Sequence, residues 1–230
     1  MIGSGPSGMD LTNEISKTAK RVTLSHHLKQ EIKSDFSDNV DQKPDIQEIT
    51  ESGVIFNDGE IVEYSLIVYC TGYQYTFPFL SVDCGVLCDD NYMRPLYKHC
   101  LNINRPTMGI IGLPHYVCAM QMFDLQIRFC LKFMTGLKKI PSKAEMIEDT
   151  DSDMNERWAR GLTKHQAHFM GKDQENYYSD LATTSEIEPL KPVISKMFNK
   201  SLCSLLHDLT NFRKDAFQVL DDDDFILIKG

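Results

Sequence analysis

The sequence has no long hydrophobic run and no excess of positive charge. A membrane-spanning helix needs about 20 consecutive apolar residues, and the most apolar C-terminal stretch covers only residues 225–228. The formal net charge is −9, with acidic segments at 148–156 and 221–224 that are expected to be solvated surface. Because nucleic-acid-binding proteins present basic patches to the phosphate backbone, this charge argues against nucleic acid as a partner.

The cysteines also show no pattern typical of a disulfide framework or of a complete metal site. The seven cysteines are scattered and odd in number, which favours reduced thiols in a reducing compartment. Cys84 and Cys88 have the spacing of half a metal site, but no second pair follows, so no metal site is predicted. The hydrophobic content of 42% and the length of 230 residues fit a globular protein of one large or two small domains.

Three glycines near the start of the chain have the G-x-G-x-x-G spacing of a dinucleotide-binding turn, Gly3, Gly5 and Gly8. In such a turn the first glycine forms the bend, the second lets the backbone approach a pyrophosphate, and the third lets the following helix pack on its strand. A helical pattern with apolar residues at 11, 15 and 19 follows, and then a β-type run at 21–24. The sequence therefore predicts that residues 3–8 hold the phosphates of a dinucleotide. A structural turn without phosphate, in which Ser7 only caps the helix, is the alternative.

Few apolar residues precede this turn. The motif should open with a buried parallel strand of about five or six residues, yet only Met1 and Ile2 precede Gly3. The loss of roughly four buried aliphatic side chains, at about 1.5–3 kcal/mol each, is comparable to the net stability of a typical domain, about 5–15 kcal/mol. We therefore expect the chain to be the back portion of a longer protein, entered just inside the motif.

The tip of the second predicted strand has no acidic residue. A site for NAD usually carries an Asp or Glu about 20 residues after the first glycine, where it binds the ribose 2′-hydroxyl. Here the chain has Ser25, His26 and His27, with Lys29 close behind. These donors and positive charges suit a 2′-phosphate, so NADP is favoured over NAD. A solvated loop tip is the alternative for the histidine pair.

The rest of the chain alternates short strands and longer helices, which indicates an α/β fold. Residues 31–44 are expected to form a loop, and the Asn57-Asp58-Gly59 turn signal predicts a β-meander. Buried strands are predicted at 66–69, ending in Cys70-Thr71-Gly72, and at 107–112, stopped by Leu113-Pro114-His115. The strands of the meander are expected at 46–50, 53–56 and 60–64, and the helices at 116–137, 143–160, 176–182 and 191–209.

Several short motifs, in this order, resemble the flavin-containing monooxygenases. The turn at residues 3–10 and the strand at 22–25 resemble the second, NADPH-binding motif of that family, and residues 70–73 resemble its Ala-Thr-Gly-Tyr signature. Residues 122–126 and 168–178 are similar to its later helix and its C-terminal region. The match covers most of residues 1–185. The Ser-His-His strand end is most similar to the insect branch, with its dimethylaniline-type and senecionine N-oxygenases.

The resemblance implies an enzyme that uses NADPH, FAD and O₂ to oxygenate the nitrogen or sulfur of a small nucleophilic substrate. It implies three regions: an NADPH-binding domain at 1–73 with a truncated first strand, the C-terminal part of a FAD-binding domain at 74–140, and a helical region at 141–230. The fold would then be an incomplete flavoprotein with two dinucleotide-binding domains, one of them Rossmann-like. The expected location is the cytoplasm or the cytosolic face of the endoplasmic reticulum. Weak membrane association and the oligomeric state stay open.

The resemblance also implies cofactor-binding residues, but no catalytic residue and no metal ligand. The family's upstream FAD motif and its identifying motif do not occur in these residues, so we expect the chain to be inactive alone. An NADP-binding module without catalysis, a partner of a separate flavin-carrying chain, and a relative of the disulfide reductases are the alternatives. Surface or helix-face roles also remain open for His115 and Gln126. The implied cofactor contacts are Gly3, Ser4, Gly5, Pro6, Ser7, Gly8, Ser25, His26, His27, Cys70, Thr71, Gly72, Gly112, Pro114, His115 and Gln126.

Overall fold

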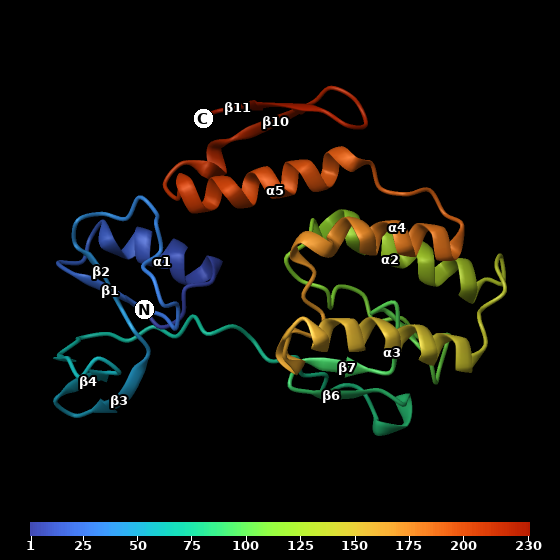
Figure 1. The fold of residues 1–230 in the computed structure, drawn as a ribbon, viewed down its shortest axis with the longest axis horizontal. Helices are drawn as coiled ribbons and strands as arrows, with labels where there is room; N and C mark the ends of the chain where they lie inside the picture. Colours follow the sequence, from blue (N-terminus) through green and yellow to red (C-terminus); the bar gives the residue numbers. More distant parts are fainter. The chain divides into compact units, whose positions relative to one another are not determined.

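The structure is a computed structural model that describes residues 1–230, and Figure 1 labels its helices and strands. The chain forms two compact units, each described here by itself. Unit 1 comprises residues 1–73, 199–218 and 226–230, and unit 2 comprises residues 74–198 and 219–225. The predicted helical region 141–230 is divided between them, because residues 141–198 belong to the same unit as residues 74–140. The expected α/β class is confirmed.

Unit 1 contains a short parallel sheet. Strand β1 (Val22–Ser25) pairs in parallel with β2 (Val40–Lys43), with Val22 opposite Val40. On the other side of β1, Ile2 forms isolated parallel bridges with Ser25 and with Tyr69. Helix α1 (Pro6–Ser16) follows and packs on β1. Residues 1–3 therefore occupy the middle position of the sheet, between β1 and residues 68–70.

The predicted meander forms beside this sheet. Strands β3 (Ile46–Thr50), β4 (Gly53–Phe56) and β5 (Ile61–Val62) pair antiparallel in sequence order. Phe56 is almost fully buried and meets the ring of Tyr64 edge-on. The hairpin turn at residues 57–59 and the first two strands lie where the sequence places them.

The C-terminal segment contributes to unit 1. Helix α5 (Pro192–His207) supplies Leu205, which joins Met9 of α1 and Leu209 in a small apolar cluster. The short helix η4 (Phe212–Lys214) follows, and Arg213 forms an ion pair with Asp10 through two hydrogen bonds. Strands β10 (Ala216–Val219) and β11 (Phe225–Ile228) form a two-stranded sheet in a region that was expected to be helical.

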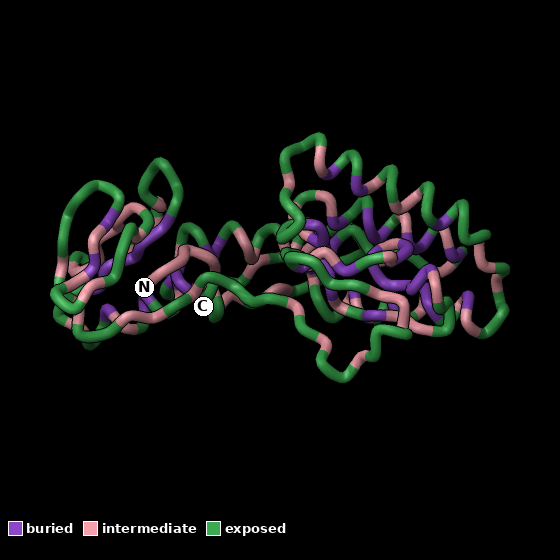
Figure 2. The backbone as a smooth tube through the Cα atoms, turned by 90° about the horizontal axis from the view of Figure 1, so that it is seen from below, coloured by how far each residue is buried: buried purple, intermediate pink, exposed green.

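Unit 2 consists of helices packed on two short hairpins. The hairpins are β6 (Leu87–Asp89) with β7 (Tyr92–Arg94), and β8 (Leu96–Tyr97) with β9 (Leu101–Asn102). Along the helices, buried positions alternate with exposed ones (Figure 2). The long helices are α2 (Ala119–Met134), α3 (Lys143–Ala159) and α4 (Gln174–Ser185), and the short ones are η1 (Val82–Cys84), η2 (Lys164–Gln166) and η3 (Gly171–Asp173).

Local sequence explains where these helices begin and what they bury. Ser142 and Glu145 form a reciprocal capping box at the start of α3, which satisfies two backbone N–H groups that the helix leaves unpaired. Helix α2 places Met122, Leu125 and Phe129 on one face, and these side chains have no measurable exposure or almost none. No helix in the structure combines the length and the apolarity needed to cross a bilayer.

Two strand predictions are wrong. Residues 66–69 form no strand beyond the bridge from Tyr69 to Ile2, and the side chains of Leu66 and Tyr69 are 70% and 66% exposed. A strand needs a neighbour along its length, and here the neighbour consists only of residues 1–3. Residues 107–112 likewise form a single bridge, from Gly109 to Leu101. In the opposite direction, β2 lies inside the segment expected to be a loop.

Candidate functional site

The glycine bend at residues 3–8 joins the middle of the sheet to α1. Gly3 has φ of +100°, a conformation that side chains with a Cβ rarely adopt. A Cβ at Gly3 would lie 2.5 Å from the carbonyl oxygen of Cys70. The first glycine is therefore required by both the backbone conformation and the close approach of residue 70.

The other two glycines have different surroundings. A Cβ at Gly8 would lie 1.9 Å from the carbonyl oxygen of Gly3, so the missing side chain lets α1 pack directly on the bend. A Cβ at Gly5 would meet no atom within 4 Å. The fold has no steric need for glycine at position 5. The open space above Gly5 is what a ligand that approaches the backbone closely would require.

The start of α1 has no side-chain cap. Gly5 is the N-cap residue, Pro6 occupies the first turn, and no side-chain oxygen accepts a hydrogen bond from the first backbone N–H groups. Ser7 is exposed and its hydroxyl makes no capping hydrogen bond, so the alternative that it only caps the helix is wrong. Free N–H groups at a helix N-terminus, together with the helix dipole, favour a bound anion. Ser4 lies within the same bend and is half-buried.

Residues 70–72 lie against this bend. The backbone N–H of Cys70 donates to the carbonyl oxygen of Ile2 at 2.7 Å, which holds Cys70 beside Gly3. Thr71 and Gly72 are exposed, and Gly72 has φ of +89°. The structure thus brings together two segments, residues 3–8 and 70–72, that are distant in the sequence and that were both predicted to contact the cofactor.

The three residues predicted to bind the 2′-phosphate do not share one surface. Ser25 is buried and its hydroxyl donates to the carbonyl oxygen of Pro44 at 2.8 Å. His26 is buried and its Nε2 lies 2.9 Å from Oε1 of Gln42, so Nε2 carries the proton. Only His27 is exposed, as is Lys29. The reason is that residues 42–44 cover both Ser25 and His26: the hydroxyl of Ser25 bonds to Pro44, and His26 bonds to Gln42 through its ring and to Lys43 through its backbone N–H.

In unit 2, the predicted flavin-side turn is held by its own hydrogen bonds. The backbone N–H of Gly112 donates to Oε1 of Gln126 at 2.9 Å, and Nε2 of Gln126 donates to the hydroxyl of Tyr177 at 2.6 Å. Gln126 is fully buried, so it fixes the turn from within the protein. The backbone N–H of Gly112 is therefore used inside the protein.

The remainder of that turn is partly accessible. Pro114 is buried, whereas the ring of His115 is half-buried and packs against Tyr116 and Phe169. The backbone of His115 is tied to the segment 168–170 by hydrogen bonds in both directions. Burial lowers the pKa of His115, so its ring is a neutral donor or acceptor at pH 7.

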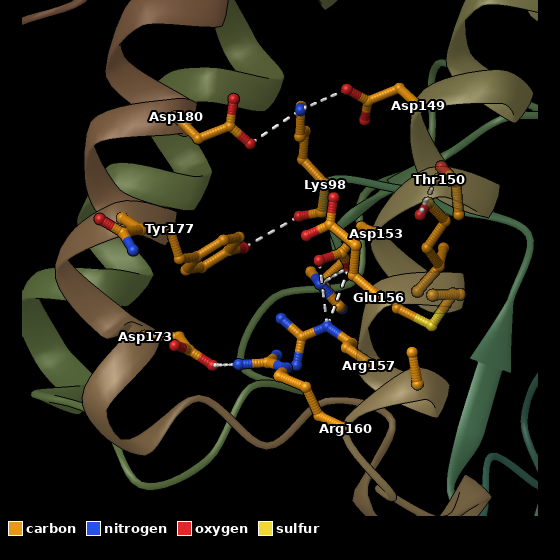
Figure 3. Close-up of a pocket in the computed structure, with 15 residues that line it drawn as sticks. Lys98, Asp149, Thr150, Asp153, Glu156, Arg157, Arg160, Asp173, Tyr177 and Asp180 are labelled. Atoms are coloured by element: carbon orange, nitrogen blue, oxygen red, sulfur yellow. Dashed lines mark hydrogen bonds and ion pairs between the residues drawn. The ribbon is translucent and has the colours of Figure 1, made fainter.

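Unit 2 contains a cavity of about 590 Å³, shown in Figure 3, which the sequence did not predict. It lies among α3, α4 and residues 96–99. Nζ of Lys98 lies 2.6 Å from Asp149 of α3 and 2.7 Å from Asp180 of α4, and so links the two helices. Its other two cationic side chains are also paired with carboxylates, Arg157 with Asp153 and Arg160 with Asp173. Every cation in the cavity is neutralised within the protein, which is typical of a structural ion-pair network.

Two buried histidines lie at the edge of this network, and their hydrogen bonds fix their tautomers. The backbone N–H of Met93 donates to Nε2 of His168 at 3.1 Å, so the proton of the neutral His168 ring is on Nδ1. That N–H donates to Nδ1 of His99 at 2.9 Å, and Nε2–H of His99 donates to Asp153 at 3.0 Å. Sequence reasoning could not find this chain of hydrogen bonds, because His99 and His168 are 69 residues apart.

Burial lowers the pKa of both His99 and His168 and keeps them neutral. Burial works against ionisation of Asp153 as well, but the hydrogen bond from His99 and the charge of Arg157 outweigh it and hold the pKa of this carboxyl well below its usual range. The group therefore consists of one carboxylate, one guanidinium and two neutral rings, with each polar atom used inside the protein.

Comparisons with known proteins agree on one protein family. A family described as "Flavin-binding monooxygenase-like" matches residues 28–203. Senecionine N-oxygenase of Tyria jacobaeae is 30% identical over 98% of this chain, and flavin-containing monooxygenase FMO GS-OX-like 2 of Arabidopsis thaliana is 31% identical over the whole of it. In each case the chain spans about half the length of the curated relative.

Solved structures agree. The S-allyl-L-cysteine S-oxygenase of Allium sativum matches with a TM-score of 0.81 and 27% identity, over 92% of this chain and 49% of that one. Tmm from Pelagibacter sp. strain HTCC7211 has a TM-score of 0.78 at 21% identity, over 97% of this chain and 50% of that one, and supports the fold alone. The resemblance inferred from the ordered motifs is confirmed, and this chain belongs to the flavin-binding monooxygenase-like family.

Proposed function

We propose that this chain provides the NADP-binding part of an NADPH- and FAD-dependent monooxygenase that oxygenates soft nitrogen or sulfur atoms of small molecules. The named relatives include an N-oxygenase and an S-oxygenase, which supports this substrate class. Dimethylaniline-type N-oxygenation is the specific activity that we propose. We also propose the cytosol or the cytosolic face of the endoplasmic reticulum as its location.

The single observation that carries the proposal is the difference among the three glycines of the bend. Two of them are needed by the protein's own packing, whereas Gly5 faces open space beside an uncapped helix N-terminus. These features fit the pyrophosphate of a dinucleotide, which needs close backbone approach and N–H donors. For the 2′-phosphate of NADP we propose His27 and Lys29, which are exposed basic side chains just after the C-terminal end of β1.

We assign NADP to the unit that contains residues 1–73, and FAD to residues 74–140. When bound, the flavin and the nicotinamide supply the electron transfer and the oxygen chemistry. The chain itself would orient them: the bend holds the pyrophosphate, and Gln126 keeps the turn at 112–115 in a fixed conformation. No side chain of this chain is assigned a catalytic role.

The test is binding of NADPH to the full chain, measured by isothermal titration calorimetry. In the variant Gly5→Val the side chain enters the space reserved for the phosphates, and because φ at Gly5 is −67° the substitution leaves the backbone unstrained. We expect Gly5→Val to bind NADPH at least about 30-fold more weakly, a loss of about 2 kcal/mol, with an unchanged melting temperature. Glu51→Val, at an exposed position between β3 and β4, is the matched control and should bind normally.

Equal affinity of Gly5→Val and the parent chain for NADPH would refute the assignment of the bend. A second arm titrates FAD into the full chain and follows the visible flavin spectrum, and then adds NADPH and a tertiary amine or thioether under air. A product heavier by one oxygen atom supports the enzyme. NADPH binding without flavin binding supports a nucleotide-binding module instead.

A further inference from the structure

Two cysteines lie side by side in the core of unit 2. Cys100 follows the turn between β8 and β9, and Cys130 lies on α2. Their sulfur atoms are 3.8 Å apart, which is within hydrogen-bond distance for sulfur. All seven cysteines of the chain are free thiols, and these two are the buried ones. The fold therefore brings together two thiols that are 30 residues apart in the sequence.

Backbone hydrogen bonds fix the position of Cys100. Its N–H donates to the carbonyl oxygen of Tyr97 at 3.2 Å, and its own carbonyl oxygen accepts from the N–H of Ile110 at 2.7 Å. The next residue, Leu101, forms an antiparallel bridge with Gly109. The side chain of Cys100 has no measurable exposure. Its backbone is thus tied to segments on both sides, and its thiol lies within the apolar core.

The thiol of Cys130 occupies space that a glycine leaves open. A Cβ at Gly109 would lie 3.1 Å from Sγ of Cys130, which is closer than an ordinary van der Waals contact. The missing side chain at Gly109 therefore lets this sulfur lie against the segment that pairs with β9. Cys130 keeps an exposure of 4%, whereas Cys100 has none. A small oxidant molecule from solvent therefore reaches the sulfur of Cys130 first.

The surroundings make the two thiols chemically unequal. Burial raises the pKa of Cys100, whereas the hydrogen bond with Cys100 lowers the pKa of Cys130, because the Cys100 thiol can donate to a thiolate at Cys130. The thiolate is the reactive form of cysteine, so Cys130 is the attacking group and Cys100 the second thiol. No third His, Cys, Asp or Glu completes a metal site around them. Redox chemistry therefore suits the pair better than metal binding.

We propose that Cys100 and Cys130 form an oxidative modification site, in which hydrogen peroxide converts the two neighbouring thiols into a disulfide. The Cys130 thiolate attacks one peroxide oxygen, the O–O bond breaks, and the departing hydroxide takes up the proton that Cys130 released. Sγ of Cys100 then attacks the resulting sulfenic acid, the S–S bond forms, and the S–O bond breaks. The hydroxide leaves as water with the proton of the Cys100 thiol. Each sulfur loses one electron, and the peroxide is reduced to two molecules of water.

The bond requires a small movement and stabilises the fold. Sulfur atoms in a disulfide are about 2.05 Å apart, so the separation of 3.8 Å must close by roughly 1.8 Å through rotation of the two side chains. The disulfide joins the β8–β9 turn to α2, one helical turn after Gln126, which supports the turn at residues 112–115. Because it closes a loop of about 30 residues in the unfolded chain, the oxidised protein should be more stable. The inference does not depend on the nucleotide proposed above, so its readouts need no cofactor.

The experiment treats the reduced full chain with hydrogen peroxide until the exposed thiol of Cys88 is fully oxidised. The chain is then unfolded in N-ethylmaleimide, digested and mapped by mass spectrometry. We expect a pair of peptides joined through Cys100 and Cys130. The melting temperature should rise by at least about 5 °C and return to its first value after reduction with dithiothreitol. Cys130→Ala should show neither effect, whereas the matched control Cys203→Ala, which removes an exposed thiol, should behave as the parent chain does.

Recovery of Cys100 and Cys130 as maleimide adducts, after Cys88 has been oxidised, would overturn the proposal. A disulfide between them that does not raise the melting temperature would overturn it as well, because the bond would then not fit the folded protein. If Cys130→Ala does not fold, Cys100→Ala takes its place. The peptide map of the parent chain decides between a linked and an unlinked pair without either variant.

Discussion

The hydroxyl of Tyr177 offers the sharpest test of how unit 2 is held together. It accepts a hydrogen bond from Nε2 of Gln126 at 2.6 Å and donates one to the carbonyl oxygen of Lys98 at 2.9 Å. Burial raises the pKa of Tyr177 well above its usual value, so this hydroxyl keeps its proton. It joins α2, α4 and the turn between β8 and β9 at one atom.

The substitution Tyr177→Phe removes this atom and little volume. It leaves the amide of Gln126 and the carbonyl of Lys98 without their partner in a buried place. An unsatisfied buried polar group costs about 1–3 kcal/mol, so we expect a loss of about 2–4 kcal/mol in the free energy of unfolding. For a chain of this length, 1 kcal/mol corresponds to about 2–4 °C in melting temperature. The expected decrease is therefore about 4–16 °C.

The assay is thermal unfolding followed by circular dichroism, with hydrogen exchange at the Gly112 amide as a local readout. That amide donates to the same side chain of Gln126, so its exchange should accelerate in the variant. Tyr92→Phe is the control, because the ring of Tyr92 packs edge-on against Trp158 and its hydroxyl has no hydrogen-bond partner in the structure. Equal decreases in the two variants, or unchanged exchange at Gly112, would show that the hydroxyl of Tyr177 does not organise the turn.

Two further predictions concern the bend and the buried histidines. Gly8→Ala places a methyl group 1.9 Å from the carbonyl oxygen of Gly3 and should lower the melting temperature by at least about 5 °C. In the control Gly5→Ala the methyl group meets no atom, so the melting temperature should stay unchanged. A Gly8→Ala variant as stable as the parent chain would contradict the close packing of α1 on the bend. Because burial lowers the folded-state pKa of His99 and His168 below the unfolded value of 6.5, the unfolded chain takes up protons first on acidification. The free energy of unfolding should therefore fall as the pH drops below about 6.5, by up to about 1.4 kcal/mol per pH unit for each histidine. Urea titrations at about pH 5 to 8 should show a smaller fall in His168→Gln than in the parent chain. Equal dependence of the unfolding free energy on pH in the two proteins would refute this account.

The sequence predicted local features well where short-range physics decides them. The glycine spacing located the bend, the Asn57-Asp58-Gly59 signal located the β3–β4–β5 meander, and apolar periodicity located the four long helices within a few residues. Each of these depends on residues within one turn or one hairpin. The prediction of a strand at 66–69 was wrong, because the apolar pattern is local but strand pairing depends on a distant segment. Here the only bridge joins Tyr69 to Ile2.

The predicted cofactor contacts also divide into those that local sequence decides and those that depend on tertiary packing. Gly3 and Gly8 have the packing roles that their spacing predicts, because a tight turn fixes its own geometry, whereas the contact of Gly5 with a pyrophosphate stays a prediction. The sequence could not show that Ser25 and His26 are buried while His27 is exposed, since this depends on β2, which comes from a segment expected to be a loop.

By itself, the sequence determined the α/β class, the glycine bend and, through the order of several weak motifs, the family. Only the tertiary structure decided that Gln126 supports a turn from inside the protein and that His99, His168 and Asp153 form one chain of hydrogen bonds. The physical reason is the separation along the sequence of the residues that interact. Turns, caps and helix periods arise between residues a few positions apart, whereas burial, tautomers and cavities arise from side chains that meet only when distant segments pack together.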